Sequence, residues 1–208
     1  MRTVSAMGAA FCVTLAACGG GSNTEPSPSP SLSITVPTNP IASGTSVQAS
    51  ASIDGSPASN VTWSSSNSAV ASVGSTGLIT GALKGGAIIH ATSGSLTGGI
   101  LVTVIPGAPA SITIFSGDGQ SGPAGSLLPD PLCTNVKDAA GNLIIGVTVS
   151  ETVVTGGGQL GLVAIAPQTD ANGVACSGFW MLGPAVGTQT VVASSAGASS
   201  VTFTATAE

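Results

Sequence analysis

The chain has 208 residues, only 5% of them charged, and a formal net charge of −5 at neutral pH. Typical globular chains carry about 25% charged residues. Lys84 and Lys137 are the only Lys or Arg residues after Arg2. Because nucleic-acid binding requires a basic patch, this class of partner is excluded. Gly, Ser and Pro interrupt every later apolar run, so no later stretch reaches the roughly 20 apolar residues that a transmembrane helix needs.

Residues 1–17 have the features of a secretory signal peptide. Arg2 supplies a positive charge, an apolar stretch follows from Val4 to Ala17, and small residues precede Cys18. This stretch is also too short for a membrane-spanning helix. We therefore expect an exported protein.

The end of this segment resembles the lipobox of bacterial lipoproteins. Residues 15–18 read Leu-Ala-Ala-Cys, whereas Cys12 follows the bulky Phe11 and is a poor competitor. The resemblance implies cleavage before Cys18, lipidation of its sulfur and attachment to a membrane. Gly19 resembles the signal for transfer to the outer membrane. The alternative is an ordinary signal peptide followed by a chance cysteine.

Residues 18–30 form the predicted linker. After the cysteine they are mostly Gly, Ser and Pro, with no apolar side chain to bury. Such a segment cannot offset the entropy lost on ordering. We expect a tether whose Gly-rich half is flexible and whose Ser-Pro half is extended.

Beyond residue 30 the sequence predicts an all-β fold. Short runs rich in Val, Ile and Thr alternate with turn residues, and Pro-Gly-Ala-Pro at 106–109 marks a domain boundary. Seven candidate strands on each side predict two tandem β-sandwiches. Pro129 and Pro131 must break or bulge one of these strands. The strands are expected at 32–36, 46–53, 61–65, 70–73, 78–81, 87–92 and 99–104, then at 111–115, 125–137, 147–155, 158–163, 174–182, 188–193 and 199–206.

Cys133 and Cys176 remain once Cys12 is removed with the signal peptide and Cys18 is lipidated. An exported protein lies in an oxidising compartment, where paired cysteines persist as a disulfide. We therefore favour a disulfide between them. The alternative is two unrelated buried thiols.

Residues 31–105 resemble the bacterial immunoglobulin-like (Ig-like) group 2 domain. Four motifs occur in order, at 61–67 (VTWSSSN), 69–73 (AVASV), 77–81 (GLITG) and 91–94 (ATSG). The resemblance implies an Ig-like β-sandwich with Trp63 packed inside. Lys84-Gly85-Gly86 departs mildly from the Ala-Gly turn that is frequent in the family.

Residues 109–207 resemble the group 1, invasin/intimin-type Ig-like domain. The matching motifs are 136–142 (VKDAAGN), 146–149 (GVTV), 155–158 (TGGG), 169–175 (TDANGVA), 180–183 (WMLG) and 201–205 (VTFTA). Cys133 and Cys176 depart from the plainest form of this pattern. The two resemblances together imply adhesion, or a spacer that presents a surface.

No catalytic constellation stands out in the sequence. His90 is the only histidine, and strand alternation points it towards solvent, away from any nucleophile it could activate. Asp138 and Asp170 are the best carboxylate pair for glycoside chemistry, and they could also contribute oxygen ligands to calcium. Both lie in Asp-x-x-Gly turns, where bonding to local backbone N–H groups is the simpler role.

No metal or cofactor is expected. One histidine and a disulfide cannot complete a four-ligand zinc site, and no dense acidic loop supports calcium. The glycine-rich residues 155–158 lack the lysine and the following helix of a phosphate loop.

Phe179 and Trp180 are the binding candidates, because aromatic side chains provide platforms for glycan and protein contacts. They are adjacent, so on a regular strand one of them must point outward. The alternative is a strand buried on both faces, or a local bulge.

These observations predict a non-enzymatic, lipid-anchored protein of the cell envelope, most consistent with the outer membrane. Its expected partners are the membrane, through the lipid anchor, and a cell-surface protein or a glycan. The alternative function is a carbohydrate-binding accessory module. An enzyme is the third hypothesis and has the least support.

Overall fold

The computed structural model describes residues 29–161 and 168–208. These residues form strands and turns without any helix, so the predicted all-β fold is confirmed. Within these two ranges there is accordingly no helix that is long and apolar enough to cross a membrane. The predicted signal peptide, Cys18 and all but the last two residues of the predicted linker lie outside the described residues.

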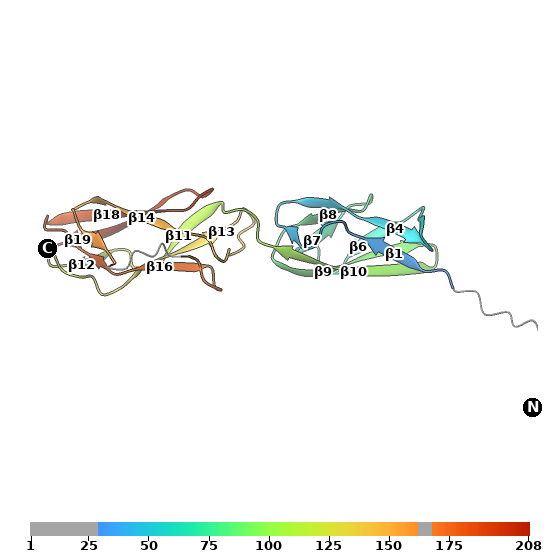
Figure 1. Ribbon diagram of the computed structural model, residues 1–208, viewed down its shortest axis with the longest axis horizontal. Coiled ribbons are helices and arrows are strands. Elements are labelled where there is room, and N and C mark those ends of the chain that lie inside the picture. The colour runs from blue at the N-terminus through green and yellow to red at the C-terminus, as the bar shows by residue number, and fades with distance from the viewer. Residues whose placement is uncertain (1–28, 162–167) are drawn as a thin grey trace, which may run out of the picture.

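The first sandwich contains strands β1 to β10, which form three hydrogen-bonded sheets with the orders β1-β4-β5, β2-β10-β9-β6 and β3-β8-β7 (Figure 1). Its strands are β1 (Leu32–Thr35), β2 (Ile41–Ala42), β3 (Ser46–Gln48), β4 (Ser50–Ile53), β5 (Ser56–Pro57), β6 (Thr62–Ser65), β7 (Ala71–Val73), β8 (Leu78–Gly81), β9 (Gly85–Ser93) and β10 (Leu96–Ile105).

The strand predicted at 46–53 is two strands. It divides at Ala49, where the chain changes its pairing partner, although the N–H of Ala49 still donates to the carbonyl oxygen of Gly77 at 2.9 Å. β3 therefore pairs with β8, while β4 pairs with β1. Periodicity alone could not show the break, because the residues on both sides of it keep a strand-like pattern.

The core of the first sandwich follows the predicted alternation. Ala87, Ile89 and Ala91 of β9 are buried, whereas His90 is exposed on the opposite face. Trp63 packs against this core and remains partly exposed.

The second sandwich contains strands β11 to β19, in sheets with the orders β11-β13-β16, β12-β19-β18-β14 and β15-β17. Residues of both larger sheets, including Ile112, Val136, Val191 and Phe203, share one buried cluster, so the core lies between these sheets. The strands are β11 (Ser111–Ser116), β12 (Gln120–Gly122), β13 (Leu132–Lys137), β14 (Ser150–Thr155), β15 (Gln159–Leu160), β16 (Val174–Gly178), β17 (Trp180–Met181), β18 (Gly187–Ser194) and β19 (Val201–Ala207).

Prolines and glycines shorten two of the predicted strands. The strand expected at 125–137 begins only at Leu132, beyond Pro129 and Pro131, which lack the N–H needed for sheet pairing. The strand expected at 174–182 divides into β16 and β17 at Gly178, which has a φ of 97°. Only residues 159–160 of the strand expected at 158–163 are paired as β15, and 162–163 lie outside the described residues.

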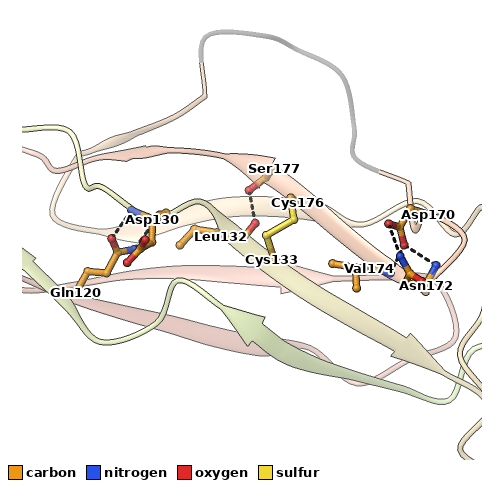
Figure 2. Close-up of a disulfide and its surroundings, with 9 residues drawn as sticks. All are labelled: Gln120, Asp130, Leu132, Cys133, Asp170, Asn172, Val174, Cys176 and Ser177. Carbon is orange, nitrogen blue, oxygen red and sulfur yellow. Dashed lines mark hydrogen bonds between the residues drawn. A yellow bond between two sulfur atoms is a disulfide. The ribbon is translucent and has the colours of Figure 1, made fainter.

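Cys133 and Cys176 form the disulfide that was predicted from the sequence (Figure 2). The two cysteines are register partners on the adjacent antiparallel strands β13 and β16. The bond therefore joins two neighbouring strands of one sheet, and it closes a loop with a sequence separation of 43 residues.

Replacing both Cys133 and Cys176 with Ser is expected to destabilise the second sandwich. Loss of the cross-link raises the entropy of the unfolded chain, and the loop length predicts a decrease of about 4 kcal/mol in the free energy of unfolding. Urea unfolding followed by Trp180 fluorescence, in a Trp63→Phe background, measures it. The first sandwich, followed through Trp63 in a Trp180→Phe background, is the internal control. Equal midpoints for the oxidised protein and the double variant would contradict the expectation.

Candidate functional site

A shallow apolar hollow of about 340 Å³ lies on the second sandwich. Its walls come from Leu127, from residues 159–161 at β15, and from Ser177, Gly178, Phe179 and Met181 of β16, β17 and the junction between them. None of these residues is charged. Binding pockets combine an apolar lining with a few polar groups, and here the polar side chains are those of Gln159 and Ser177. The hollow therefore suits the apolar face of a ligand.

Phe179 and Trp180 occupy opposite faces of the chain at this point. Phe179 is 45% exposed and lines the hollow, whereas Trp180 is fully buried in the core beside Phe203 and Leu182. One aromatic ring therefore points outward, and it is that of Phe179, which lies between β16 and β17 rather than on a regular strand. Trp180 is therefore no longer a candidate binding residue, because a ligand cannot reach its buried side chain.

Glu151 is a buried carboxylate that the sequence analysis did not single out. Among the residues that the structure describes, neither of its oxygen atoms has a hydrogen-bond partner within standard geometry. Burial raises the pKa of Glu151, and the nearby Ser177 hydroxyl opposes this only in part. The sequence contained a signal for this burial. Val149, Glu151 and Val153 are spaced two residues apart, so strand alternation places their side chains on the same, inward-facing side.

The two turn aspartates accept hydrogen bonds from N–H groups of their own turns. Oδ1 of Asp170 accepts hydrogen bonds from the backbone N–H groups of Asn172 and Val174, at 2.8 and 3.0 Å (Figure 2). These bonds lower the pKa of Asp170. Oδ1 of Asp138 accepts the equivalent bonds from Ala140 and Asn142, at 3.0 and 2.8 Å. The backbone-bonding role predicted for both residues is therefore confirmed.

Asp138 differs from Asp170 in what its second oxygen contacts. Oδ2 accepts hydrogen bonds from the backbone N–H of Gly107 at 2.9 Å and from Nδ2 of Asn142 at 2.8 Å. Burial raises the pKa of Asp138, but the side chain of Asn142 and the N–H groups of Gly107, Asn142 and Ala140 outweigh it, so that the pKa is lowered overall. With four donors on its two oxygens, this carboxylate has no evident capacity for a metal ion.

Other arrangements that could support chemistry are not assembled in residues 29–161 and 168–208. His90 lies on the outer face of the first sandwich, opposite Ser64 and Gly99 in the sheet register. No three His, Cys, Asp or Glu side chains of the described ranges are grouped so that they could hold a metal ion.

Comparison with protein-family models matches residues 29–104 to the bacterial Ig-like domain (group 2). This agrees with the resemblance noted for the first sandwich. A search of curated proteins gives no significant match.

Solved structures of bacterial surface proteins align with this chain. The Escherichia coli adhesin FdeC aligns with a TM-score of 0.54 and 20% identity, over 84% of this chain and 63% of that chain. The Yersinia pseudotuberculosis adhesin InvE aligns with a TM-score of 0.41 and 18% identity, over 86% and 60%. Domains 4 and 5 of the S-layer protein SbsC give 0.41 and 18%, over 85% and 96%. This chain thus spans less than two thirds of either adhesin chain. The predicted Ig-like fold is confirmed by the family match and by the likeness to FdeC.

Replacing Glu151 with Gln is expected to stabilise the protein at neutral pH. The raised pKa means that the folded state binds the proton more tightly than the unfolded state, so the ionised carboxylate opposes folding above the raised pKa. We expect the Tm at pH 7 to rise by a few degrees, since about 1 kcal/mol corresponds to roughly 4–8 °C for a domain of this size. The difference should shrink as the pH falls through the raised pKa towards 4.5.

Thermal unfolding followed by circular dichroism across this pH range measures the effect. Asp130→Asn removes an exposed negative charge from the same sandwich and controls for net charge. A Glu151→Gln protein with an unchanged or lower Tm at pH 7 would contradict the expectation.

Proposed function

We propose that this protein is a non-enzymatic, lipid-anchored component of the cell envelope that projects an adhesive or spacer surface away from the membrane. The observation that carries the proposal is the end-to-end arrangement of the two sandwiches. Strand β1 lies at one end of the long axis and the C-terminus lies at the other (Figure 1). With the lipobox-like sequence and linker before β1, the second sandwich becomes the part farthest from the anchor.

The sequence supports each part of this proposal. Cys18 is the proposed lipidated residue, followed by the linker, the proposed group 2 domain at 31–105 and the proposed group 1 domain at 109–207. Gly19 supports placement in the outer membrane. The fold is shared with FdeC, which is described as an adhesin, and we extend an adhesive or spacer role to this chain on that basis.

The chemistry of the described residues supports binding rather than catalysis. Asp138 and Asp170 accept hydrogen bonds from N–H donors, and His90 lies on an exposed face of the first sandwich. Glu151 is a single carboxylate, whereas glycoside hydrolysis usually requires two. The apolar hollow, in contrast, offers contact area that is mostly apolar.

Replacing Cys18 with Ala is expected to release the protein from membranes. Without the sulfur no diacylglycerol can be attached, and the described residues contain no membrane-crossing helix to replace it. Fractionation of cells, followed by partition between water and detergent, measures the change. Cys12→Ala is the matched control and should remain with the membrane. Retention of the Cys18→Ala protein in the detergent phase would argue against the anchor.

The exposed ring of Phe179 favours a second candidate function, carbohydrate binding. An aromatic side chain beside an apolar hollow can pack against the C–H face of a sugar ring. The protein would then act as a carbohydrate-binding accessory module held at the envelope.

Replacing Phe179 with Ser is expected to remove glycan binding if this second function holds. A glycan array measures binding of the unaltered protein and of the variant, and we expect at least a tenfold loss. Phe115→Ser is the matched control, since Phe115 is 59% exposed and lies outside the hollow. An array without signal for the unaltered protein would exclude the carbohydrate hypothesis and leave adhesion to a protein.

A further inference from the structure

We propose that Asp138 and Asn142 form a latch that holds the two sandwiches in one fixed orientation, so that they move as a single body. This inference concerns the mechanics of the chain. It requires neither the lipid anchor nor an adhesive role, and its test is independent of both.

The latch is built on a turn that the second sandwich holds rigidly. The N–H of Asp138 donates to the carbonyl oxygen of Asn142 at 3.0 Å, and the N–H of Gly141 donates to the carbonyl oxygen of Asp138 at 3.1 Å. Oδ1 of Asp138 adds two more bonds within the turn, to Ala140 and Asn142. Asp138 and Asn142 are only 4% and 8% exposed. The turn therefore presents its two polar side chains in a defined geometry.

The facing surface of the first sandwich is equally well held. It consists of residues 82–84, which follow β8. The N–H groups of Ala82 and Leu83 donate to the carbonyl oxygens of Val70 and Ala69, at 2.8 and 3.2 Å. The Ser43 hydroxyl donates to the Ala82 carbonyl oxygen at 2.6 Å. A contact made to residues 82–84 is thus a contact made to the body of the first sandwich.

Two hydrogen bonds from the Asn142 side chain cross between the sandwiches. Its Oδ1 accepts from the N–H of Lys84 at 2.8 Å, and its Nδ2 donates to the Ala82 carbonyl oxygen at 3.0 Å. Nδ2 also donates to Oδ2 of Asp138 at 2.8 Å. Flipping the amide would place its oxygen against a carboxylate and a carbonyl, so only one orientation satisfies all partners. Asn142 therefore matches a donor and an acceptor on the first sandwich at once.

The third crossing bond holds the connecting segment. The N–H of Gly107 donates to Oδ2 of Asp138 at 2.9 Å. A Cβ at Gly107 would lie only 2.7 Å from the carbonyl oxygen of Ser43, so the segment also packs closely against the first sandwich. The N–H of Ala110 donates to the Lys137 carbonyl oxygen at 2.9 Å, which fastens the end of the segment to the second sandwich. The segment that connects the sandwiches therefore contacts both of them.

Domains joined by small polar interfaces ordinarily move relative to one another. The Asp170 turn shows what the local motif does by itself. It has the same Asp-x-x-Gly sequence, and its Oδ1 likewise accepts hydrogen bonds from the N–H groups two and four residues ahead. Among the described residues, however, the hydrogen bonds of its side chain all lie within residues 170–174. The crossing bonds thus distinguish the Asp138 turn from its counterpart, and Asp170 provides a matched control.

The test is nuclear magnetic resonance of the full chain, ¹⁵N-labelled, with the disulfide formed and without lipid. Residual dipolar couplings of each sandwich give one alignment tensor per sandwich, and ¹⁵N relaxation gives the tumbling time of each. For the unaltered protein we expect one shared tensor and one tumbling time. Asn142→Ala, which removes two crossing bonds, should separate the tensors and change their relative magnitude about twofold or more. Asp138→Ala combined with Asn142→Ala should separate them further.

Asp170→Ala should retain one shared tensor, because it disturbs the same kind of turn without touching the first sandwich. Amide chemical shifts away from the altered turn verify that each sandwich remains folded. If Asp138→Ala unfolds the second sandwich, Asn142→Ala decides the question, since it leaves both Oδ1 bonds of Asp138 in place. Separate tensors in the unaltered protein, or a shared tensor in the Asn142→Ala protein, would overturn the proposal.

Discussion

Four N–H donors converge on the carboxylate of Asp138, three from its own turn, which includes the side chain of Asn142, and one from the segment that connects the sandwiches. A buried carboxylate costs free energy unless its oxygens are hydrogen-bonded. The turn and the connecting segment must therefore keep their positions together, and Asn142 of the same turn bonds to residues 82 and 84 of the first sandwich. In a chain with so few charges, one buried ion organises the contact between two otherwise separate cores.

The rest of each sandwich is held by apolar packing between sheets and by disulfide cross-linking in the second. The cores consist mainly of Val, Ile, Ala and Leu, with Trp180 and Phe203 as the large fully buried rings of the second core. Cys133 and Cys176 bind β13 to β16 beside that core. The candidate binding features lie at an interruption between two strands. Phe179 and the apolar hollow lie at the junction between β16 and β17. The carboxylate of Glu151 is buried near the Ser177 hydroxyl, which only partly offsets the rise in its pKa that burial causes.

Most of the fold could be predicted from the sequence because strand periodicity and turn chemistry are local. The alternation of β9, the interruption at Pro129 and Pro131, and the disulfide all follow from residue type and position. The errors have tertiary causes. Strands of two or three residues such as β2 and β12 are too short to show a period. The break at Ala49 is a change of partner strand, from β8 to β1, and both partners lie far from it in sequence.

The sequence by itself determined the all-β class and the paired Asp-x-x-Gly turns, and it predicts export and lipidation at Cys18. Only the tertiary structure decided that Phe179, rather than Trp180, faces solvent, and that the two turns have different roles. The bonds within the Asp138 turn join residues two and four positions apart, so they follow from the local sequence. The crossing bonds join residues 31, 58 and 60 positions apart. Such contacts exist only when two separately folded sandwiches bring their ends together, and no local pattern encodes that meeting.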